Sequence, residues 1–196
     1  MTRRLLPLSL ARALCALLFA ALAGAPLAAP AQASSGQTYT AQEILDSGHH
    51  FFGSTAGGLA SVVEELFSSY GMPNGYILGE EGSGALVGGL TYGEGTLYTK
   101  NAGDHVVFWQ GPSIGWDIGG QGSRTMMLVY NLDSISSLYK RFVGVSGSAY
   151  AIAGLGFHVL KNGNVLLVPV RTGVGARLGF NLGYLKLTQT PTWNPF

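Results

Sequence analysis

The stretch of this sequence with the clearest chemical potential is Gly111–Gly115, which reads GPSIG. It fits the pattern G-x-S-x-G, which marks the nucleophile elbow of acyl hydrolases. An elbow needs a strand, a sharp turn at the serine and then a helix, whereas the residues after Ser113 alternate as they would in a strand. Pro112 also fixes its own backbone directly before the serine. The pattern therefore favours a turn into a Gly-rich strand. An acyl hydrolase using Ser113 stays as an alternative, because the chain has histidines and acidic residues for a triad.

Three other patterns are more typical of structure than of chemistry. The run 173–179 resembles a loose dinucleotide fingerprint, but it continues into alternation instead of opening a helix. His49 and His50 are adjacent on an expected helix, so their side chains point to different sides and a shared metal is not expected. Glu80 and Glu81 flank an expected Gly-rich turn, which favours solvated carboxylates. We therefore expect no catalytic residue, no metal ligand and no cofactor.

The first 33 residues have the features of a secretory signal peptide. The segment begins with three arginines, Arg3, Arg4 and Arg12, which come before an apolar run over 13–23. It ends in Ala31-Gln32-Ala33, an A-x-A cleavage site. Cleavage after Ala31 and cleavage after Ala33 both fit, and an uncleaved membrane anchor is the alternative. We expect a mature chain of one domain, residues 34–196, located in the periplasm.

Composition narrows the functions open to the mature chain. Cys15 is the only cysteine and leaves with the signal, which excludes cysteine catalysis and Cys-ligated zinc. The chain has 11 basic and 10 acidic residues; removal of three arginines with the signal leaves eight basic ones, a net charge of about −2. Without a basic run, nucleic acid is not an expected partner. Charged residues make up 11% and glycines number 30, which is typical of a compact β protein or of one that meets lipid.

Two helices are expected before the period of the apolar residues changes. Thr40 and Glu43 form a capping box, which predicts a helix to about Phe52. Ser54 is expected to cap a second helix, which has one apolar face and runs to residue 70. Asp133 is expected to cap a short helix near 134–141.

Most of the remaining chain alternates with a period of two. Asn162-Gly163 predicts a type I′ hairpin turn. Alternating glycines suit a tightly curved sheet and leave room for a large side chain from a facing strand. The fold class is therefore α+β, mainly β: a small antiparallel β-barrel or strongly curved sheet with two N-terminal helices. Strands are expected over 76–78, 85–90, 96–100, 105–110, 114–118, 124–130, 148–160, 164–170 and 175–188.

Three sequence blocks carry a family resemblance over residues 38–190. They are the helix start TAQEIL, the block GPSIGWDIGGQGSRTMMLVYN and the block VPVRTGVGARLGFNLGYLKLT. Together they resemble the EipA family, periplasmic envelope-integrity proteins of Gram-negative bacteria. The resemblance implies a small periplasmic β-barrel with helices packed against it and a role in resisting envelope stress. It implies no catalytic residues.

A more distant likeness is to lipid-binding SYLF domains. The strand entry at 111–115, the strand ending in Asn131 and the Gly-Ala strands of 144–157 follow a similar order. This likeness implies phospholipid binding, for which the plausible basic residues near the barrel are Arg124, Lys140, Arg141, Arg171 and Arg177. Trp109 and Trp116 flank the GPSIG turn and are either core residues or the lining of an apolar pocket at a barrel mouth. The candidate contacts for lipid or another apolar ligand are Trp109, Trp116, Arg124, Tyr150 and Phe157.

These observations favour a non-enzymatic periplasmic protein that supports the cell envelope, with phospholipid or an envelope protein as partner. One alternative is an outer-membrane transmembrane β-barrel, which the low charge, the many glycines and the terminal Phe196 suit. Pro191 and Pro195 interrupt the last segment and speak against that alternative. The acyl hydrolase using Ser113 is the second alternative.

Overall fold

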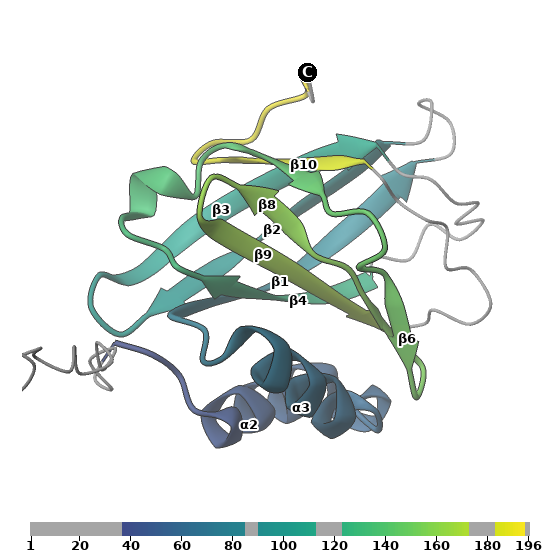
Figure 1. Ribbon diagram of the computed structural model, residues 1–196. Helices are drawn as coiled ribbons and strands as arrows, with labels where there is room; N and C mark the ends of the chain where they lie inside the picture. Colours follow the sequence, from purple (N-terminus) through teal and green to yellow (C-terminus); the bar gives the residue numbers. More distant parts are fainter. Residues whose placement is uncertain (1–36, 85–89, 113–122, 173–182, 195–196) are drawn as a thin grey trace, which may run out of the picture. The chain divides into compact units, whose positions relative to one another are not determined.

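The computed structural model describes residues 37–84, 90–112, 123–172 and 183–194 (Figure 1). All of them belong to one compact unit, Ser34–Phe196. Among the residues singled out from the sequence, Ser113, Trp116 and Arg177 lie outside the described residues, as do most of the strands expected over 85–90, 114–118 and 175–188.

The first helix follows directly from its local sequence. Helix α2 spans Ala41–Phe52 and begins with the predicted capping box: the Thr40 side chain accepts from the Glu43 backbone, and the Glu43 side chain accepts from the Thr40 backbone. Gly53 ends the helix with a positive φ of 62°, a conformation that glycine adopts without steric cost. The predicted boundaries of this helix are confirmed.

The second helix begins later than its sequence predicts. A 3-10 turn, η1, spans Gly53–Thr55, and helix α3 spans Leu59–Tyr70. The expectation that Ser54 caps this helix is wrong: the N-cap is Gly58, which has no side-chain cap hydrogen bond. A Cβ at Gly58 would lie 2.7 Å from the carbonyl oxygen of Ala153. The start of α3 is therefore set by close contact with a distant strand connection rather than by a capping side chain.

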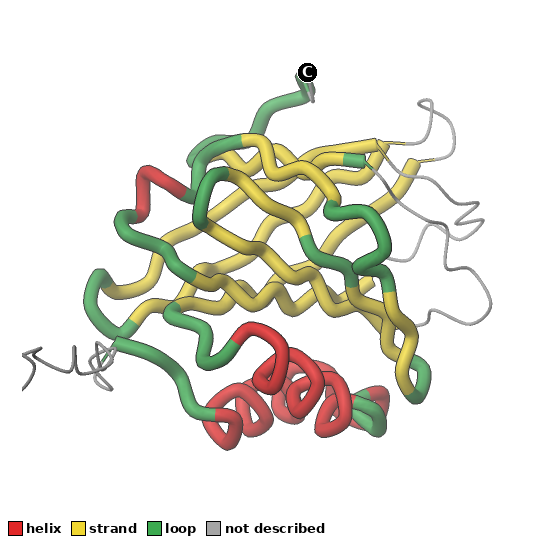
Figure 2. The backbone as a smooth tube through the Cα atoms, in the orientation of Figure 1, coloured by secondary structure: helices red, strands yellow, loops and turns green. Residues whose placement is uncertain are grey.

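The described strands form a closed antiparallel β-barrel (Figures 1 and 2). Neighbours in the ring are β4-β1-β2-β3-β10-β5-β8-β9, and pairing of β4 with β9 closes it. Strand β7 pairs with the C-terminal half of β9, following β8 along the same register, and β6 pairs with β7. The predicted α+β, mainly β, fold with a small barrel is confirmed. The strand bounds are β1 Gly75–Gly84, β2 Leu90–Thr99, β3 Gly103–Pro112, β4 Ser123–Tyr130, β5 Arg141–Gly144, β6 Tyr150–Ile152, β7 Leu155–Phe157, β8 Leu160–Asn162, β9 Val165–Thr172 and β10 Tyr184–Thr188.

A hairpin forms at the predicted place in the chain, but its two-residue turn is Gly163-Asn164 rather than Asn162-Gly163. The expected type I′ turn is wrong, because that type needs a positive φ at both turn residues and Asn164 is not among the described residues with a positive φ. Asn162 pairs with Val165 across the turn, and Gly163 has a φ of 57°.

Strands β7 and β8 keep one register against β9, with Phe157 opposite Val170 and Leu160 opposite Leu167. The same register places His158 opposite Pro169, which has no N–H to donate. The ladder is interrupted there, which separates β7 from β8. The turn at Ala153-Gly154, where both residues have a positive φ, separates β6 from β7, so the strand expected over 148–160 is divided into three.

The prediction of a short helix near 134–141, capped by Asp133, is wrong in both the length of the helix and the capping residue. A single 3-10 turn, η3, spans Ile135–Ser137, and its N-cap is Ser134 rather than Asp133. The Ser134 hydroxyl bonds the hydroxyls of Ser136 and Ser137, and such local side-chain bonds compete with a continuing helix. The backbone then joins the sheet, because the Lys140 carbonyl accepts from the Leu187 N–H at 3.0 Å.

Two apolar cores lie on opposite faces of the barrel wall, one outside it and one inside it. The outer core lies between the two helices and the outer face of β4, β9 and β1, with Leu66 of α3 and Met126 of β4 both fully buried (Figure 1). The inner core fills the described part of the barrel interior. Its buried members are Ile77, Leu97, Val107, Trp109, Met127, Val129, Leu132, Leu138, Phe142, Leu160, Val165, Leu167, Leu185 and Leu187.

Glycine makes the room that Trp109 occupies in the interior. Trp109 lies opposite Gly93 in the β2–β3 register, and a Cβ at Gly93 would lie 2.2 Å from the indole ring. The prediction that strand glycines accommodate a large side chain from a facing strand is confirmed. The expected turn at Glu80-Glu81 is wrong, because both residues lie within β1, opposite Glu94 and Gly93.

Candidate functional site

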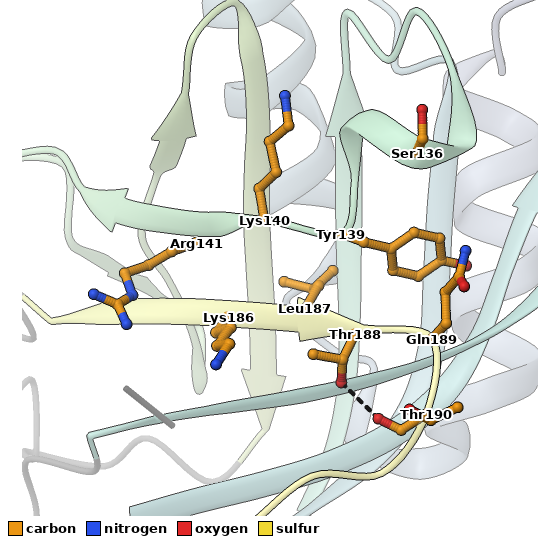
Figure 3. A pocket seen from close by; sticks show the side chains of 9 residues that line it. All are labelled: Ser136, Tyr139, Lys140, Arg141, Lys186, Leu187, Thr188, Gln189 and Thr190. Atoms are coloured by element: carbon orange, nitrogen blue, oxygen red, sulfur yellow. Dashed lines mark hydrogen bonds between the residues drawn. The ribbon is translucent and has the colours of Figure 1, made fainter. Parts of the chain in front are cut away.

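An open groove lies on the outside of the barrel where η3, β5 and β10 meet (Figure 3). Its volume is about 670 Å³, and we call it the basic groove. Cationic and hydroxyl-bearing side chains dominate the lining. The lining residues are Ser136, Tyr139, Lys140, Arg141, Lys186, Leu187, Thr188, Gln189 and Thr190.

Strand pairing brings two cations of the basic groove directly together. Arg141 of β5 and Lys186 of β10 are register partners, and Lys140 precedes Arg141 in the chain. Like charges directly opposite each other destabilise an antiparallel pair. None of the lining residues that the structure describes is acidic. An anion placed between the two side chains would lower the cost of bringing the two cations together.

The cations of the groove are held in position by their neighbours. The Arg141 guanidinium lies over the Tyr184 ring, 4.5 Å from its centroid. Asn162 Nδ2 donates to the Arg141 carbonyl at 2.8 Å, which fixes the backbone of that residue. Lys186 Nζ donates to the Asn194 carbonyl at 3.1 Å. Positioning before a ligand arrives lowers the entropy cost of binding.

Hydroxyl groups add hydrogen-bonding capacity to the groove. Desolvation by burial raises the pKa of Tyr139, so its phenol stays protonated and remains a donor. The Thr188 hydroxyl donates to the Thr190 carbonyl at 2.9 Å, which turns the chain back after β10 (Figure 3). Guanidinium, ammonium and hydroxyl groups together are suited to bind phosphate or carboxylate oxygens.

A second polar cluster lies within the barrel wall, facing the interior. Arg171 of β9 pairs with both carboxylate oxygens of Glu81, and its Nη2 lies 3.1 Å from Oε2. Trp109 Nε1 donates to the same Oε2 at 3.2 Å.

Two further polar side chains lie near this ion pair. Burial and the Arg171 charge lower the pKa of His158 to about 3, so the imidazole is neutral. The Thr125 hydroxyl is buried and has no hydrogen-bond partner among the described residues. The ion pair neutralises itself, so the cluster offers no net charge to a ligand.

Of the described residues proposed from the sequence as lipid contacts, Tyr150 and Phe157 are brought together, whereas Trp109 and Arg124 lie elsewhere. Trp109 is 1% exposed in the inner core, and Arg124 lies beside α2, where its Nη1 donates to the Phe51 carbonyl at 2.7 Å. Tyr150 is 46% exposed and stacks on the buried Phe157 at 5.2 Å, at the edge formed by β6 and β7. Trp116 lies outside the described residues.

The sequence analysis named part of the basic groove and missed the rest. Lys140 and Arg141 were among the basic residues weighed for lipid headgroups, but Lys186 was not. The missing signal is the pairing of β10 with β5, which places Lys186 opposite Arg141 and which no local pattern reveals. The described residues contain no group of three or more His, Cys, Asp or Glu side chains that could hold a metal ion. They also contain no helix long and apolar enough to cross a membrane.

Comparison with known proteins places this barrel in a family. The family model described as "Envelope integrity protein A" (EipA) matches residues 37–196, which is most of the chain. The chain belongs to this family. The EipA resemblance inferred from the sequence blocks is thereby confirmed.

One solved structure supports both the family and the fold. It is the crystal structure of a β-barrel-like, uncharacterized protein from Brucella abortus. That protein is 74% identical to this chain, with a TM-score of 0.76, and the match covers 82% of this chain and 99% of the other.

A curated relative gives a much weaker match. A glycerol kinase from Thermus brockianus is 26% identical over 148 residues, which is 74% of this chain and 27% of that protein. This chain therefore spans about a quarter of the length of that relative. A match this low and partial does not show a family, and we carry no kinase activity over from it.

Proposed function

We propose that this protein is an exported, non-enzymatic periplasmic protein that supports envelope integrity by binding an anionic lipid through its basic groove. The observation that carries the proposal is the Arg141–Lys186 pair, with Lys140 beside it and no acidic residue in the described lining. Membership of the envelope-integrity family supports the envelope role. The signal-like segment 1–33 supports export.

The chemistry of the groove supports binding rather than turnover. A general base or nucleophile needs an imidazole, a carboxylate, a thiol or an activated hydroxyl. The described lining has cations, hydroxyls and an amide, without an imidazole, carboxylate or thiol to activate a hydroxyl. Such a set of side chains binds anions and has no group that would take up a proton at neutral pH.

The structure gives little support to a transmembrane barrel. Transmembrane strands need about 9–11 residues, whereas β5 has 4 residues and β8 has 3. The outer face of β4, β9 and β1 is covered by α2 and α3 instead of being open to lipid. The acyl hydrolase alternative depends on Ser113, outside the described residues. The variant Ser113→Ala tests it, since ester hydrolysis by the purified protein that disappears in this variant would establish that activity.

The test of the proposed function is binding of a dispersed short-chain lipid. We would titrate the mature chain with dihexanoyl phosphatidylglycerol below its critical micelle concentration, with dihexanoyl phosphatidylcholine as the neutral comparison. We expect binding of the anionic lipid alone. Arg141→Gln should weaken it by about tenfold or more, because a hydrogen bond to a charged group contributes about 1.5–3 kcal/mol.

The matched control for this titration is Arg124→Gln. It removes a cation on the helical side of the barrel, far from the groove in the fold, so we expect unchanged affinity. Equal weakening by both variants would mean that net charge, rather than the groove, determines binding. Absence of any preference for the anionic lipid in the wild type would refute the proposed function.

A further inference from the structure

Charge is unevenly distributed over the described surface of the barrel. The helices carry the acidic side chains Glu43, Asp46, Glu64 and Glu65. Strands β5, β8 and β10 contain no acidic residue at all. Basic residues gather on these strands and just before them: Lys140, Arg141, Lys161 and Lys186.

The ring order places the acidic and the basic regions on opposite sides. Helices α2 and α3 cover β9, β4 and β1. In the eight-membered ring β10 is four positions away from β4, and β5 is four positions away from β1, whereas β8 is next to β9. Figure 1 shows the helices along one side of the barrel and β10 and β8 along the other. Among the described residues, acidic side chains thus predominate on the helical side, where Lys100 pairs with Glu43, and basic side chains predominate around β5 and β10.

The basic side also exposes apolar side chains. Val143 is 54% exposed and Val145 is 42% exposed. Strand register places Val143 between Lys161 of β8 and Tyr184 of β10. We call the surface formed by Lys140, Arg141, Val143, Val145, Lys161, Tyr184 and Lys186 the basic face. Cations that surround exposed apolar groups are the combination by which proteins bind the surface of an anionic bilayer.

The barrel interior does not suit an acyl chain. Its described part is filled by the protein's own apolar side chains, and those of Val107, Met127 and Leu167 are fully buried. Close-packed interiors of this kind accept extra methylene groups only at a cost in stability. A bound lipid would therefore keep its acyl chains outside the barrel.

From these observations we propose that the basic face docks on the surface of an anionic lipid bilayer, with Val143 and Val145 entering the headgroup region. This inference rests on the proposed function and specifies its form. The protein engages lipid that remains in the membrane, and it does not extract single lipid molecules. The groove binds one headgroup while Lys161 and the valines contact its neighbours.

The test is co-sedimentation of the full mature chain with vesicles. One set contains phosphatidylcholine only, and the other contains about one third phosphatidylglycerol. We expect sedimentation with the anionic vesicles, and its loss at about 1 M salt, where the Debye length falls to about 3 Å. Lys161→Gln should lower the partition coefficient about fivefold, because a basic residue near an anionic surface contributes about 1 kcal/mol.

Valine variants separate docking from simple charge attraction. The double variant Val143→Ser with Val145→Ser should lower partitioning about tenfold or more, because both side chains lose their apolar contact with the bilayer. The matched control is Val106→Ser, since Val106 is 60% exposed on β3, outside the basic face. Circular dichroism verifies that each variant is folded.

The outcomes distinguish the two proposals. Binding of dispersed phosphatidylglycerol without binding of vesicles would overturn docking and leave the proposed function standing. Equal vesicle binding by the Val143/Val145 variant and by wild type would overturn docking as well. Absence of binding to either form of lipid would overturn both proposals.

Discussion

The neutral, partly buried His158 leads to a specific prediction of how stability depends on pH. Burial and the charge of Arg171 lower its pKa to about 3 in the folded protein, whereas an unfolded histidine has a pKa of about 6.5. Between these values the unfolded chain binds one more proton than the folded chain. Stability must therefore decrease as the pH falls below about 6.5.

The size of the effect follows from the two pKa values. One proton taken up on unfolding changes the free energy by about 1.36 kcal/mol for each pH unit. Between pH 7.5 and pH 5, His158 should lower the free energy of unfolding by about 2 kcal/mol. This result needs only a folded pKa well below 5. The carboxyl of Glu43 does not interfere, because its hydrogen bonds to Lys100 and Thr40 lower its pKa from 4.5 to about 2, so its stabilising contribution is lost only below this window.

Urea unfolding followed by circular dichroism at pH 7.5 and pH 5 measures the effect, with His158→Gln as the comparison. Glutamine is neutral at both pH values, so the variant should lose about 2 kcal/mol less than wild type between them. The absolute stability of the variant at pH 7.5 does not enter this difference. If wild type and variant change equally between the two pH values, then His158 is not held neutral by the fold and the reasoning is wrong.

Three further substitutions test the packing and the helix start. Gly93→Ala would place a Cβ 2.2 Å from the Trp109 ring, so we expect a loss of about 3 kcal/mol and a shifted tryptophan emission spectrum; a fully stable variant would contradict the packing. Thr40→Ala removes the capping box of α2 and should cost about 1 kcal/mol in urea unfolding, while an unchanged midpoint would show that the cap is not needed. Leu66→Ala empties a fully buried position of the outer core and should cost about 2–5 kcal/mol, and a loss below about 1 kcal/mol would mean that the helices pack loosely on the barrel.

The sequence predicts those parts of the fold that local interactions decide. The Thr40 capping box and the hairpin after Asn162 involve residues close in the chain. The capping box forms as expected, and the hairpin turn forms one residue later than predicted. The start of α3 depends on contact between Gly58 and Ala153, almost a hundred positions apart in the chain, so a capping pattern at Ser54 misled the prediction.

The same distinction explains what was missed at the candidate site. Lys186 and Arg141 become neighbours only because β10 pairs with β5. The order of strands in a barrel depends on contacts between residues far apart in the chain. The alternation of apolar and polar residues within one strand does not predict that order. The sequence predicts that strand glycines accommodate a large side chain, but it does not identify that side chain. That it is Trp109, with Gly93 and Glu81 beside it, follows only from the register.

The position of β10 between β3 and β5 also has a consequence for how this chain folds. The ring remains open until residues 184–188, close to the end of the chain, are in place. Up to that moment β3 and β5 each expose an unpaired edge, and such edges recruit other chains. A chain that folds in order from its N-terminus would thus complete its barrel only once residues 184–188 are available. Loss of β10 would leave an open sheet in which β3 and β5 have unpaired edges, rather than a smaller closed barrel.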